Sequence, residues 1–311
     1  MTSATTGRRA LLATAVVAPV LAIVVHSAAV AAGADAAGGA RIGRNTVVFQ
    51  SVRDGNEDIY AVDPSGTGLR RLTTDPAPDS APGVSPDRSA VVMASERHGN
   101  SDIYLLRVGD GSTTRLTFDD RFDFHPVFSH DGETILFQRM TDGFFDLWVM
   151  AADGDGARKL TTLPLNEVGG VYAPDDSLIA FMGNNGGNRD IRVMQADGTG
   201  VVNVTSGWCV DGSTGAGCIL SQEIMPAWTP DGRIVFVSDR SGSPQLWIMD
   251  ANGSDASQVT HLAGVNGHPS VSANGKTIAF NLDGSLATVQ LDGTGVHRLT
   301  ATEDYGTAYP Y

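Results

Sequence analysis

The chain has 311 residues, of which 41% are hydrophobic and 18% charged, and this composition excludes both a coiled coil and an intrinsically disordered chain. Its 35 aspartate and glutamate residues outnumber 21 lysine and arginine residues, so the net charge is −14 at pH 7. That sign argues against nucleic acid as a partner, because binding to a phosphate backbone depends on cationic side chains.

Residues 1–32 are a predicted signal peptide. Arg8 and Arg9 precede an apolar run over residues 10–25, and residues 29–31 read Ala-Val-Ala. A charged start, an apolar centre and a small-residue exit are the three regions of a secretory signal. The arginine pair also resembles the start of a twin-arginine export signal. We therefore expect the mature protein to be exported and to be secreted, periplasmic or held at the cell surface.

A short linker, residues 33–44, joins this segment to the body of the chain. The alternative to cleavage is an uncleaved membrane anchor, since residues 10–32 are long enough to span a bilayer. Contact with a membrane is expected only through this segment, and only if it is retained.

From residue 45 to residue 311 one sequence unit is repeated six times. The first anchor of the unit is an acidic or polar residue followed by Ile or Leu and usually an aromatic residue: Asp58-Ile59-Tyr60, Asp102-Ile103-Tyr104, Asp146-Leu147-Trp148, Asp190-Ile191-Arg192, Gln245-Leu246-Trp247 and Ser285-Leu286-Ala287. The second anchor is Arg71-Leu72-Thr73, Arg115-Leu116-Thr117, Lys159-Leu160-Thr161, Asn203-Val204-Thr205, Gln258-Val259-Thr260 and Arg298-Leu299-Thr300. The second anchors lie 44, 44, 44, 55 and 40 residues apart, which is typical of repeat architectures.

Within each unit the pattern is that of β-strands. Short apolar runs such as residues 47–49, 135–137 and 179–181 are too brief for helices and are bounded by turn residues. Turns of the Ser-Pro-Asp and Asp-Gly-x-Gly types recur at fixed places and divide each unit into four strands. The sequence therefore predicts an all-β, six-bladed β-propeller of four-stranded antiparallel blades over residues 45–311.

The two ends of the chain are predicted to close this ring. The first unit begins directly at its second strand, so its first strand is missing. Pro82, Pro126 and Pro269, which mark the first strand elsewhere, fall nine residues after their threonine, and Pro310 falls ten residues after Thr300. We therefore expect the C-terminal strand to pair with the N-terminal blade, which removes an open sheet edge.

The recurring motifs resemble the repeat of TolB-type (WD40-like) β-propellers. Residues 238–242, which read Ser-Asp-Arg-Ser-Gly, are a particularly close match. The resemblance covers residues 45–311 and implies the propeller fold. TolB itself carries a further domain before its propeller, whereas only residues 33–44 lie between the predicted signal peptide and the first blade in this sequence.

Four acids stand three residues before the position of the first-strand proline: Asp79, Asp123, Glu167 and Glu223. The tight turns share one face of a propeller, so these acids are expected on the opposite face, which carries the variable loops and the links between blades. Convergence near the axial opening would offer oxygen ligands to a hard cation, and Ca²⁺ is the candidate ion. The alternative is that these acids cap local turns, in which case no cofactor is required.

Two further pairs on this face are candidate ligand-binding residues. His125 and His268 each precede a first-strand proline in blades on opposite sides of the axis, where two locally hydrogen-bonded histidines are the simpler interpretation. Phe144 and Phe145 are adjacent aromatic residues in the loop of the third blade and form a candidate contact patch. Three arginines repeated after the second strand are expected to be structural partners of acids: Arg53, Arg97 and Arg240.

The step of 55 residues marks an insertion between the fourth and fifth blades. It contains both cysteines of the chain, Cys209 and Cys218, which are predicted to form a disulfide in an exported protein. Trp208 beside them is a candidate to overhang the mouth of a pocket. The alternative is a surface insertion without a function.

No nucleophile elbow, phosphate-binding loop or zinc-protease helix is present in the sequence. We therefore predict a monomeric, non-catalytic propeller that binds an extracytoplasmic protein, peptide or envelope polymer through its variable face. The alternative is a polysaccharide lyase or glycosidase that acts in the axial pocket, with carboxylates and a metal. Its catalytic groups would be drawn from Asp123, His125, Glu167 and Glu223.

Overall fold

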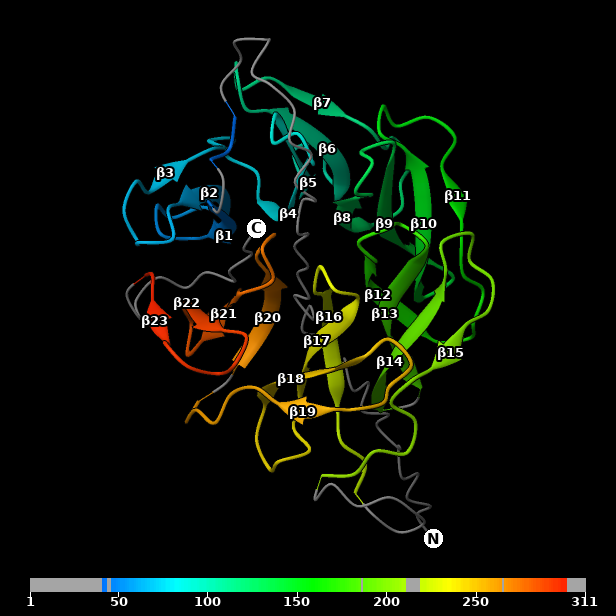
Figure 1. Ribbon diagram of the computed structural model, residues 1–311. Coiled ribbons are helices and arrows are strands. Elements are labelled where there is room, and N and C mark those ends of the chain that lie inside the picture. Colours follow the sequence, from blue (N-terminus) through cyan, green and yellow to red (C-terminus); the bar gives the residue numbers. More distant parts are fainter. Residues whose placement is uncertain (1–40, 44–45, 186, 211–218, 265, 301–311) are drawn as a thin grey trace, which may run out of the picture.

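The computed structural model describes residues 41–43, 46–185, 187–210, 219–264 and 266–300. Every regular element in these residues is a β-strand, and none of them belongs to a helix that could cross a membrane. The strands form six antiparallel sheets arranged around a central axis, five with four strands and one with three (Figure 1). The predicted six-bladed propeller is confirmed.

Within a blade the strands follow one another in chain order from the innermost strand to the outermost. The innermost strands are β4 (Asp79–Val84), β8 (Asp123–Phe128), β12 (Asn166–Tyr172), β16 (Glu223–Trp228) and β20 (Asn266–Val271). The second strands are β1 (Val47–Ser51), β5 (Ala90–Ser95), β9 (Thr134–Thr141), β13 (Leu178–Asn185), β17 (Arg233–Ser238) and β21 (Thr277–Leu282). The third strands are β2 (Asp58–Val62), β6 (Asp102–Arg107), β10 (Phe144–Ala151), β14 (Asn188–Gln195), β18 (Gln245–Asp250) and β22 (Ser285–Gln290). The outer strands are β3 (Arg70–Arg71), β7 (Thr113–Arg115), β11 (Arg158–Lys159), β15 (Val202–Asn203), β19 (Ser257–Gln258) and β23 (His297–Arg298).

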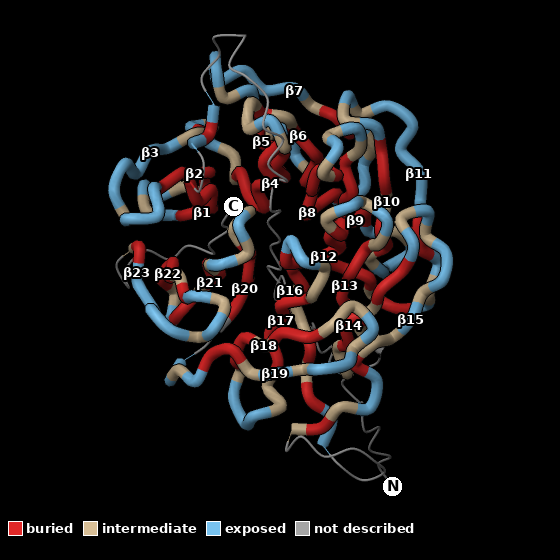
Figure 2. The backbone as a smooth tube through the Cα atoms, viewed as in Figure 1, coloured by how far each residue is buried: buried red, intermediate tan, exposed pale blue. Residues whose placement is uncertain are grey.

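The core lies between neighbouring blades, and burial decreases outward from the inner strands (Figure 2). Every residue of β1 and β5 is buried, because blades cover both faces of these strands. This explains why the second strands read as continuous apolar runs rather than as alternating patterns. One large side chain per blade occupies the same position in these strands and is fully buried: Phe49, Met93, Phe137, Phe181, Phe236 and Phe280.

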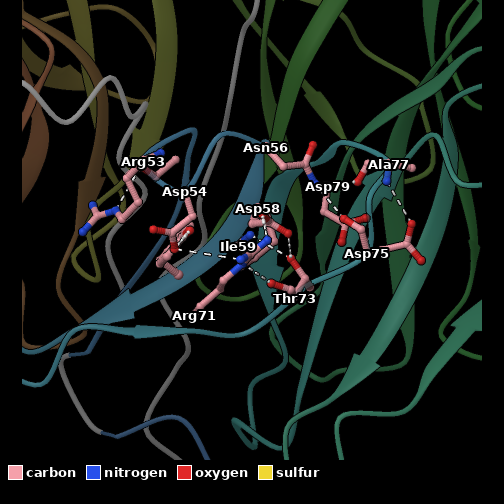
Figure 3. A network of polar contacts seen from close by, with 12 residues as sticks. Arg53, Asp54, Asn56, Asp58, Ile59, Arg71, Thr73, Asp75, Ala77 and Asp79 are labelled. Atoms are coloured by element: carbon pink, nitrogen blue, oxygen red, sulfur yellow. Dashed lines mark hydrogen bonds and ion pairs between the residues drawn. The ribbon is translucent and has the colours of Figure 1, made fainter.

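The two repeated anchors of the sequence are bonded to each other in every blade. In the first blade the Ile59 N–H donates to Thr73 Oγ1 at 2.9 Å, and the Thr73 hydroxyl donates to Asp58 (Figure 3). The same bond from the third strand to the anchor threonine has a length of 2.9–3.0 Å in the other five blades. Arg71 completes the first-blade unit through an ion pair with Asp58. The repeated threonine is therefore a structural device that joins the third strand to the end of the outer strand.

Replacing one of these threonines tests this interpretation. Thr117→Val leaves the buried Ile103 N–H without its acceptor, so we expect a loss of about 1–3 kcal/mol in the free energy of unfolding. Thr114→Val, at an exposed position of the same outer strand, is the matched control and should leave the stability unchanged. Urea unfolding at neutral pH measures both, and equal stabilities of the two variants would contradict the structural role.

The ring is closed by packing between the last and first blades. Gly66 in the first blade has a φ of +77°, and a Cβ at this position would lie 2.9 Å from the carbonyl oxygen of Leu299 in the sixth blade. Only glycine adopts this positive φ without strain and has no Cβ to clash with that oxygen. One hydrophobic cluster also runs across this junction, because Leu286 and Leu299 pack with residues of the first blade such as Val48.

Three predictions fall partly or wholly outside the described residues. The predicted pairing of the C-terminal strand with the first blade involves Pro310, and residues 301–311 are not described. The predicted signal peptide and most of the linker are likewise outside the described part of the chain, as is Cys218. The first blade contains three strands in the described residues, in the order β1-β2-β3.

Candidate functional site

The predicted acids lie on one face of the ring. Asp79 pairs with Ser95 and Glu223 pairs with Ser238, so each inner strand begins where the second strand of the same blade ends. This face therefore carries the links between blades and the loops between second and third strands, and we call it the link face. The opposite face, which carries the tight turns, is called the turn face.

Two of the four acids form ion pairs within their own blades. The Arg97 Nη2 lies 2.7 and 2.9 Å from the two carboxylate oxygens of Asp79. Arg139 binds Asp123 through Nε and Nη2, each at 2.6 Å. Both acids are 0% exposed. Burial raises the pKa of Asp123 and the bonds to Arg139 oppose that rise, while the same bonds to Asp123 raise the pKa of the guanidinium.

The other two acids, Glu167 and Glu223, form no ion pair with an arginine in the described part of the chain. Glu223 Oε1 accepts hydrogen bonds from the hydroxyls of Ser221 and Ser238, at 2.5 and 2.9 Å. Neither oxygen of Glu167 accepts a well-formed hydrogen bond from the residues that the structure describes, although the Thr161 hydroxyl is near enough to lower its pKa. Both glutamates are 0% exposed, and burial raises the pKa of each to about 7. These carboxyl groups can therefore hold or release a proton near neutral pH.

The acids do not form a shared cation cage in the described residues. No group of three or more His, Cys, Asp or Glu side chains in this part of the chain is arranged to hold a metal ion. Asp79 and Asp123 are engaged by guanidinium groups, with which a Ca²⁺ ion would have to compete. The expected convergence of these acids on one calcium ion is thus not found in the described structure.

The two candidate histidines occupy equivalent bulges of β8 and β20. Both have positive φ, 54° for His125 and 50° for His268. Neither ring nitrogen of His125 has a hydrogen-bond partner among the described residues, so the local hydrogen bond expected for this histidine is not found there. Burial holds the pKa of His125 well below its ordinary value, and His268 lowers it further.

The phenylalanine pair begins strand β10 and does not lie in a loop. Asp142 and Gly143 both have positive φ and form a tight two-residue turn, which extends the β9–β10 hairpin to Phe144. Phe144 is 45% exposed, and Phe145 is half-buried.

Three further exposed apolar side chains belong to this hairpin or to the link that precedes β8, and Phe118 in that link lies 5.1 Å from the Arg115 guanidinium, measured to the ring centroid. Phe118 and Phe122 in the link before β8 and Met140 at the end of β9 are exposed, Phe118 by 71%. The Phe122 ring lies 6.0 Å from that of Phe145, between ring centroids, and Met140 N–H donates to the Phe122 carbonyl. We call this set the aromatic patch: Phe118, Phe122, Met140, Phe144 and Phe145.

Sequence reasoning missed the link residues of this patch. The available signal was that residues 118–122 contain two phenylalanines, whereas the corresponding links at 74–78 and 162–166 contain none. From Phe122 the aromatic contacts continue inward, with centroid distances of 5.7 Å to Phe124 and 4.8 Å from Phe124 to His125. The patch is therefore continuous with the inner strand β8.

The insertion after the fourth blade is anchored to the fifth. The Trp208 ring lies 5.9 Å from that of Phe236, and the Arg240 guanidinium lies 4.3 Å above the Trp208 ring. Trp208 is thus half-buried against the blade and does not stand free over an opening. Cys209 is buried and forms a β-bridge with Leu220. The pairing of Cys209 with Cys218 stays a prediction, because Cys218 lies outside the described residues.

The repeated arginines make different structural contacts, and the predicted acid partner is found for Arg97. Arg97 binds Asp79, as described above. Arg53 lies over the rings of Phe49 and Tyr60, at 5.1 and 4.8 Å from the centroids. Arg240 stacks on two tryptophan rings, those of Trp208 and Trp247. These guanidinium groups serve the packing of the blades and are not free anion sites.

A six-bladed propeller with an anchor threonine in each blade defines this protein as an all-β repeat protein. The chain belongs to the TolB beta propeller domain family, whose pattern matches residues 26–208 and 172–306. No curated protein sequence matches the chain.

Solved structures similar to this chain have the same fold. A structure assigned to TolB of Agrobacterium tumefaciens is 20% identical, with a TM-score of 0.65, over 86% of this chain and 97% of that one. TolB from Acinetobacter baumannii is 18% identical, with a TM-score of 0.66, over 86% of this chain and 64% of that one. An oligogalacturonate lyase from Vibrio parahaemolyticus is 13% identical, with a TM-score of 0.59, over 82% of this chain and 74% of that one.

Proposed function

We propose that the protein is an exported, non-catalytic binding module that holds a partner polypeptide on its link face. The observation that carries the proposal is the aromatic patch, which contains four of the large exposed hydrophobic side chains of the described residues. Exposed apolar side chains on the turn face, such as Leu69, Val202 and Val296, belong to three different blades. A contiguous apolar patch on a rigid scaffold is typical of an interaction site, whereas isolated exposed side chains are not.

The chemistry of the patch favours a polypeptide with apolar and basic side chains. Aromatic residues contribute most of the binding energy in many protein interfaces. Asp120 and Asp142 are exposed beside the patch, and no ion pair forms at either residue within the described parts of the chain. With a net charge of −14 the protein also attracts basic partners and repels acidic envelope polymers.

The location of the interaction follows from the N-terminal segment. The signal peptide predicted for residues 1–32 supports export to the periplasm, the cell surface or the medium. An oxidising compartment would also allow the proposed disulfide between Cys209 and Cys218, which would close the insertion between the fourth and fifth blades.

Substitutions in the aromatic patch should weaken the interaction without affecting the fold. A photoreactive phenylalanine analogue at Phe118 identifies the partner in envelope extract, and the purified partner is then titrated by calorimetry. We expect the double variant Phe118→Ser/Phe144→Ser to raise the dissociation constant by about tenfold or more, because both rings lose buried contact area. The matched control is Leu69→Ser/Val202→Ser, which removes exposed apolar side chains from the turn face and should leave the constant unchanged.

The control decides between the link face and the rest of the surface. Equal binding by the two double variants would contradict the proposed site, and crosslinks from position 69 but not from position 118 would move it to the turn face. Saturable binding to a purified envelope polysaccharide, with no polypeptide crosslinked, would replace the polypeptide by the polymer as the ligand.

A polysaccharide lyase or glycosidase is the second candidate. It is favoured by Glu167, whose pKa of about 7 suits a general acid, and by the similarity to an oligogalacturonate lyase. The full burial of Glu167, Glu223 and Asp123 weighs against it, because a polymer must reach such groups. Turnover of acidic oligosaccharides that Glu167→Gln abolishes would establish the enzyme and exclude the non-catalytic proposal.

A further inference from the structure

Arg240 in the fifth blade has no acidic partner in the described residues, unlike its counterpart in the second blade. Both arginines stand four residues after the large buried side chain of the second strand. Arg97 donates through Nε to Ser95 Oγ at 2.8 Å and through Nη2 to both oxygens of Asp79. The Nε of Arg240 is buried, and no acceptor for it is found in the described part of the chain. The guanidinium of Arg240 is thus held in place by groups other than the acid of its blade.

Two tryptophan rings hold this guanidinium. Its carbon atom, Cζ, lies 4.3 Å from the ring centroid of Trp208 and 4.8 Å from that of Trp247. Trp208 belongs to the inserted link before the fifth blade and Trp247 to β18, and both side chains are only partly buried. Aromatic rings that face one cation are a typical binding site for guanidinium and alkylammonium groups. Arg240 therefore occupies, within its own chain, a site of the kind that binds organic cations.

The acid that corresponds to the partner of Arg97 is present in the fifth blade. Glu223 begins the inner strand and is paired in register with Ser238, at the position of Asp79 in the second blade. The Ser238 hydroxyl donates to Glu223 Oε1 at 2.9 Å and accepts the backbone N–H of Arg240 at 3.2 Å, so one side chain connects the arginine to the acid. Glu223 Oε2 is buried and has no hydrogen-bond partner within the described ranges. Glu223 therefore offers a second place for the guanidinium, with the geometry that the second blade shows.

The surroundings of the two tryptophans carry negative charge that no cation neutralises. Asp239 accepts the backbone N–H of Gln222 at 2.8 Å. The Gln222 side chain donates to Asn188 Oδ1 at 3.4 Å, and the Asn188 amide donates to Asp190 at 2.9 Å. The second donor to Asp190 is the amide of Asn203, so neither aspartate has a cationic partner in the part of the chain that the structure describes. This negative charge attracts a cationic ligand to the link between the fourth and fifth blades.

We propose that Trp208 and Trp247 bind the guanidinium or alkylammonium group of an organic cation. The ligand displaces Arg240, which then pairs with Glu223. In this exchange one cation replaces another on the rings, and the buried acid gains the partner that it lacks. The affinity of the parent is reduced, because the ligand competes with a side chain that already occupies the site. The site lies between the fourth and fifth blades, whereas the aromatic patch belongs to the third, so it does not depend on the proposed polypeptide partner.

Titration of the purified full chain with tetramethylammonium chloride, followed by tryptophan fluorescence, tests the site against sodium chloride at equal concentration. Arg240→Ser vacates the rings, so it should bind tetramethylammonium about tenfold more tightly than the parent, or better. The folded double variant Trp208→Leu/Arg240→Ser should lose this binding, because one ring is removed. Arg53→Ser is the matched control, since Arg53 lies over Phe49 and Tyr60, which are 1% and 2% exposed and closed to a ligand. Binding by Arg240→Ser that is no tighter than that of Arg53→Ser would overturn the proposal.

The displacement of the arginine has its own readouts. In a crystal structure of the parent with tetramethylammonium, the ligand should contact both tryptophans and Arg240 should donate to Glu223. Glu223→Gln should weaken binding to the parent by about threefold or more but should not affect Arg240→Ser, because the acid acts only by receiving the arginine. An equal loss in both backgrounds, or a bound ligand with Arg240 unmoved, would contradict the displacement.

A second probe distinguishes the two sources of such a cation. N-acetyl-arginine amide carries the guanidinium of a polypeptide side chain, whereas tetramethylammonium represents a free quaternary ammonium compound. Tighter binding of the amide to the parent would assign the site to an arginine of a polypeptide, and tighter binding of tetramethylammonium would assign it to the free compound. Binding of neither probe to Arg240→Ser would exclude a cation site at these rings.

Discussion

Replacing Arg139 by methionine is expected to destabilise the propeller by about 3–5 kcal/mol, because the substitution leaves the buried carboxylate of Asp123 without its cation. The arginine side chain in β9 is 5% exposed, and its Nε and Nη2 donate to the two oxygens of Asp123 at 2.6 Å. Its Nη1 lies 2.7 Å from Asp119, and its guanidinium lies 4.7 Å above the Trp148 ring. One side chain thus joins the inner strand, the second strand, the third strand and the link.

The effect of Arg139→Met should depend on pH. Without the guanidinium, the pKa of Asp123 in the folded state rises further above its unfolded value, since burial alone already raises it. The folded variant then holds a proton that the unfolded chain releases, so its deficit in stability is small at low pH and grows as the pH rises. Urea unfolding of the parent and the variant at pH 5 and pH 8 measures this difference.

The double variant Asp123→Leu/Arg139→Met separates the lost ion pair from lost packing. Replacing both charges by apolar side chains should recover most of the stability, because no unpaired charge stays buried. A double variant as unstable as Arg139→Met, at both pH values, would show that the guanidinium acts by packing on Trp148 instead. A deficit of Arg139→Met that is independent of pH would contradict the ionised pair.

The fold could be predicted from the sequence because each blade repeats the same local chemistry. The anchor threonines recur at a nearly constant spacing, and each accepts one backbone N–H of the third strand, as Thr73 does from Ile59. Because every blade needs this contact, the same short sequence motif recurs in every blade. The number of sequence repeats therefore predicts the number of blades, and the six blades are confirmed.

The site could be predicted only in part, because it consists of departures from the repeat. Phe122 reaches Phe145 through a contact between a link and a hairpin, and neither position is marked by the repeated unit. On the turn face, Asp176 stands where three other blades have glycine, and it accepts the backbone N–H groups of His130 and Asp131 at 2.8 and 2.9 Å. A contact between two positions that both differ from the repeated unit can be recognised only when the structure places the neighbouring blades side by side.

Stability should fall as the pH rises from 5 to 8, and Glu167 and Glu223 are the principal cause. Burial raises the pKa of each from 4.5 to about 7 in the folded state. Between these values the folded chain holds protons that the unfolded chain has released, so the contribution is fully present below pH 4.5 and is lost as the pH passes 7. At about 1.4 kcal/mol per pH unit for each group, the loss reaches about 3 kcal/mol per glutamate.

Glutamine substitutions isolate this effect, because glutamine mimics the protonated carboxyl at every pH. Glu167→Gln should be more stable than the parent at pH 8 and should lose less stability between pH 5 and pH 8, and Glu223→Gln should behave in the same way. The double variant should keep a small slope from Glu57, whose pKa burial and the neighbouring Glu96 raise to about 6. Asp292→Asn is the matched control: its hydrogen bonds from Thr294 lower the pKa of the acid, so it affects stability only under more acidic conditions. A parent that is equally stable at pH 5 and pH 8, or a Glu167→Gln variant with the slope of the parent, would show that these buried glutamates are ionised at neutral pH.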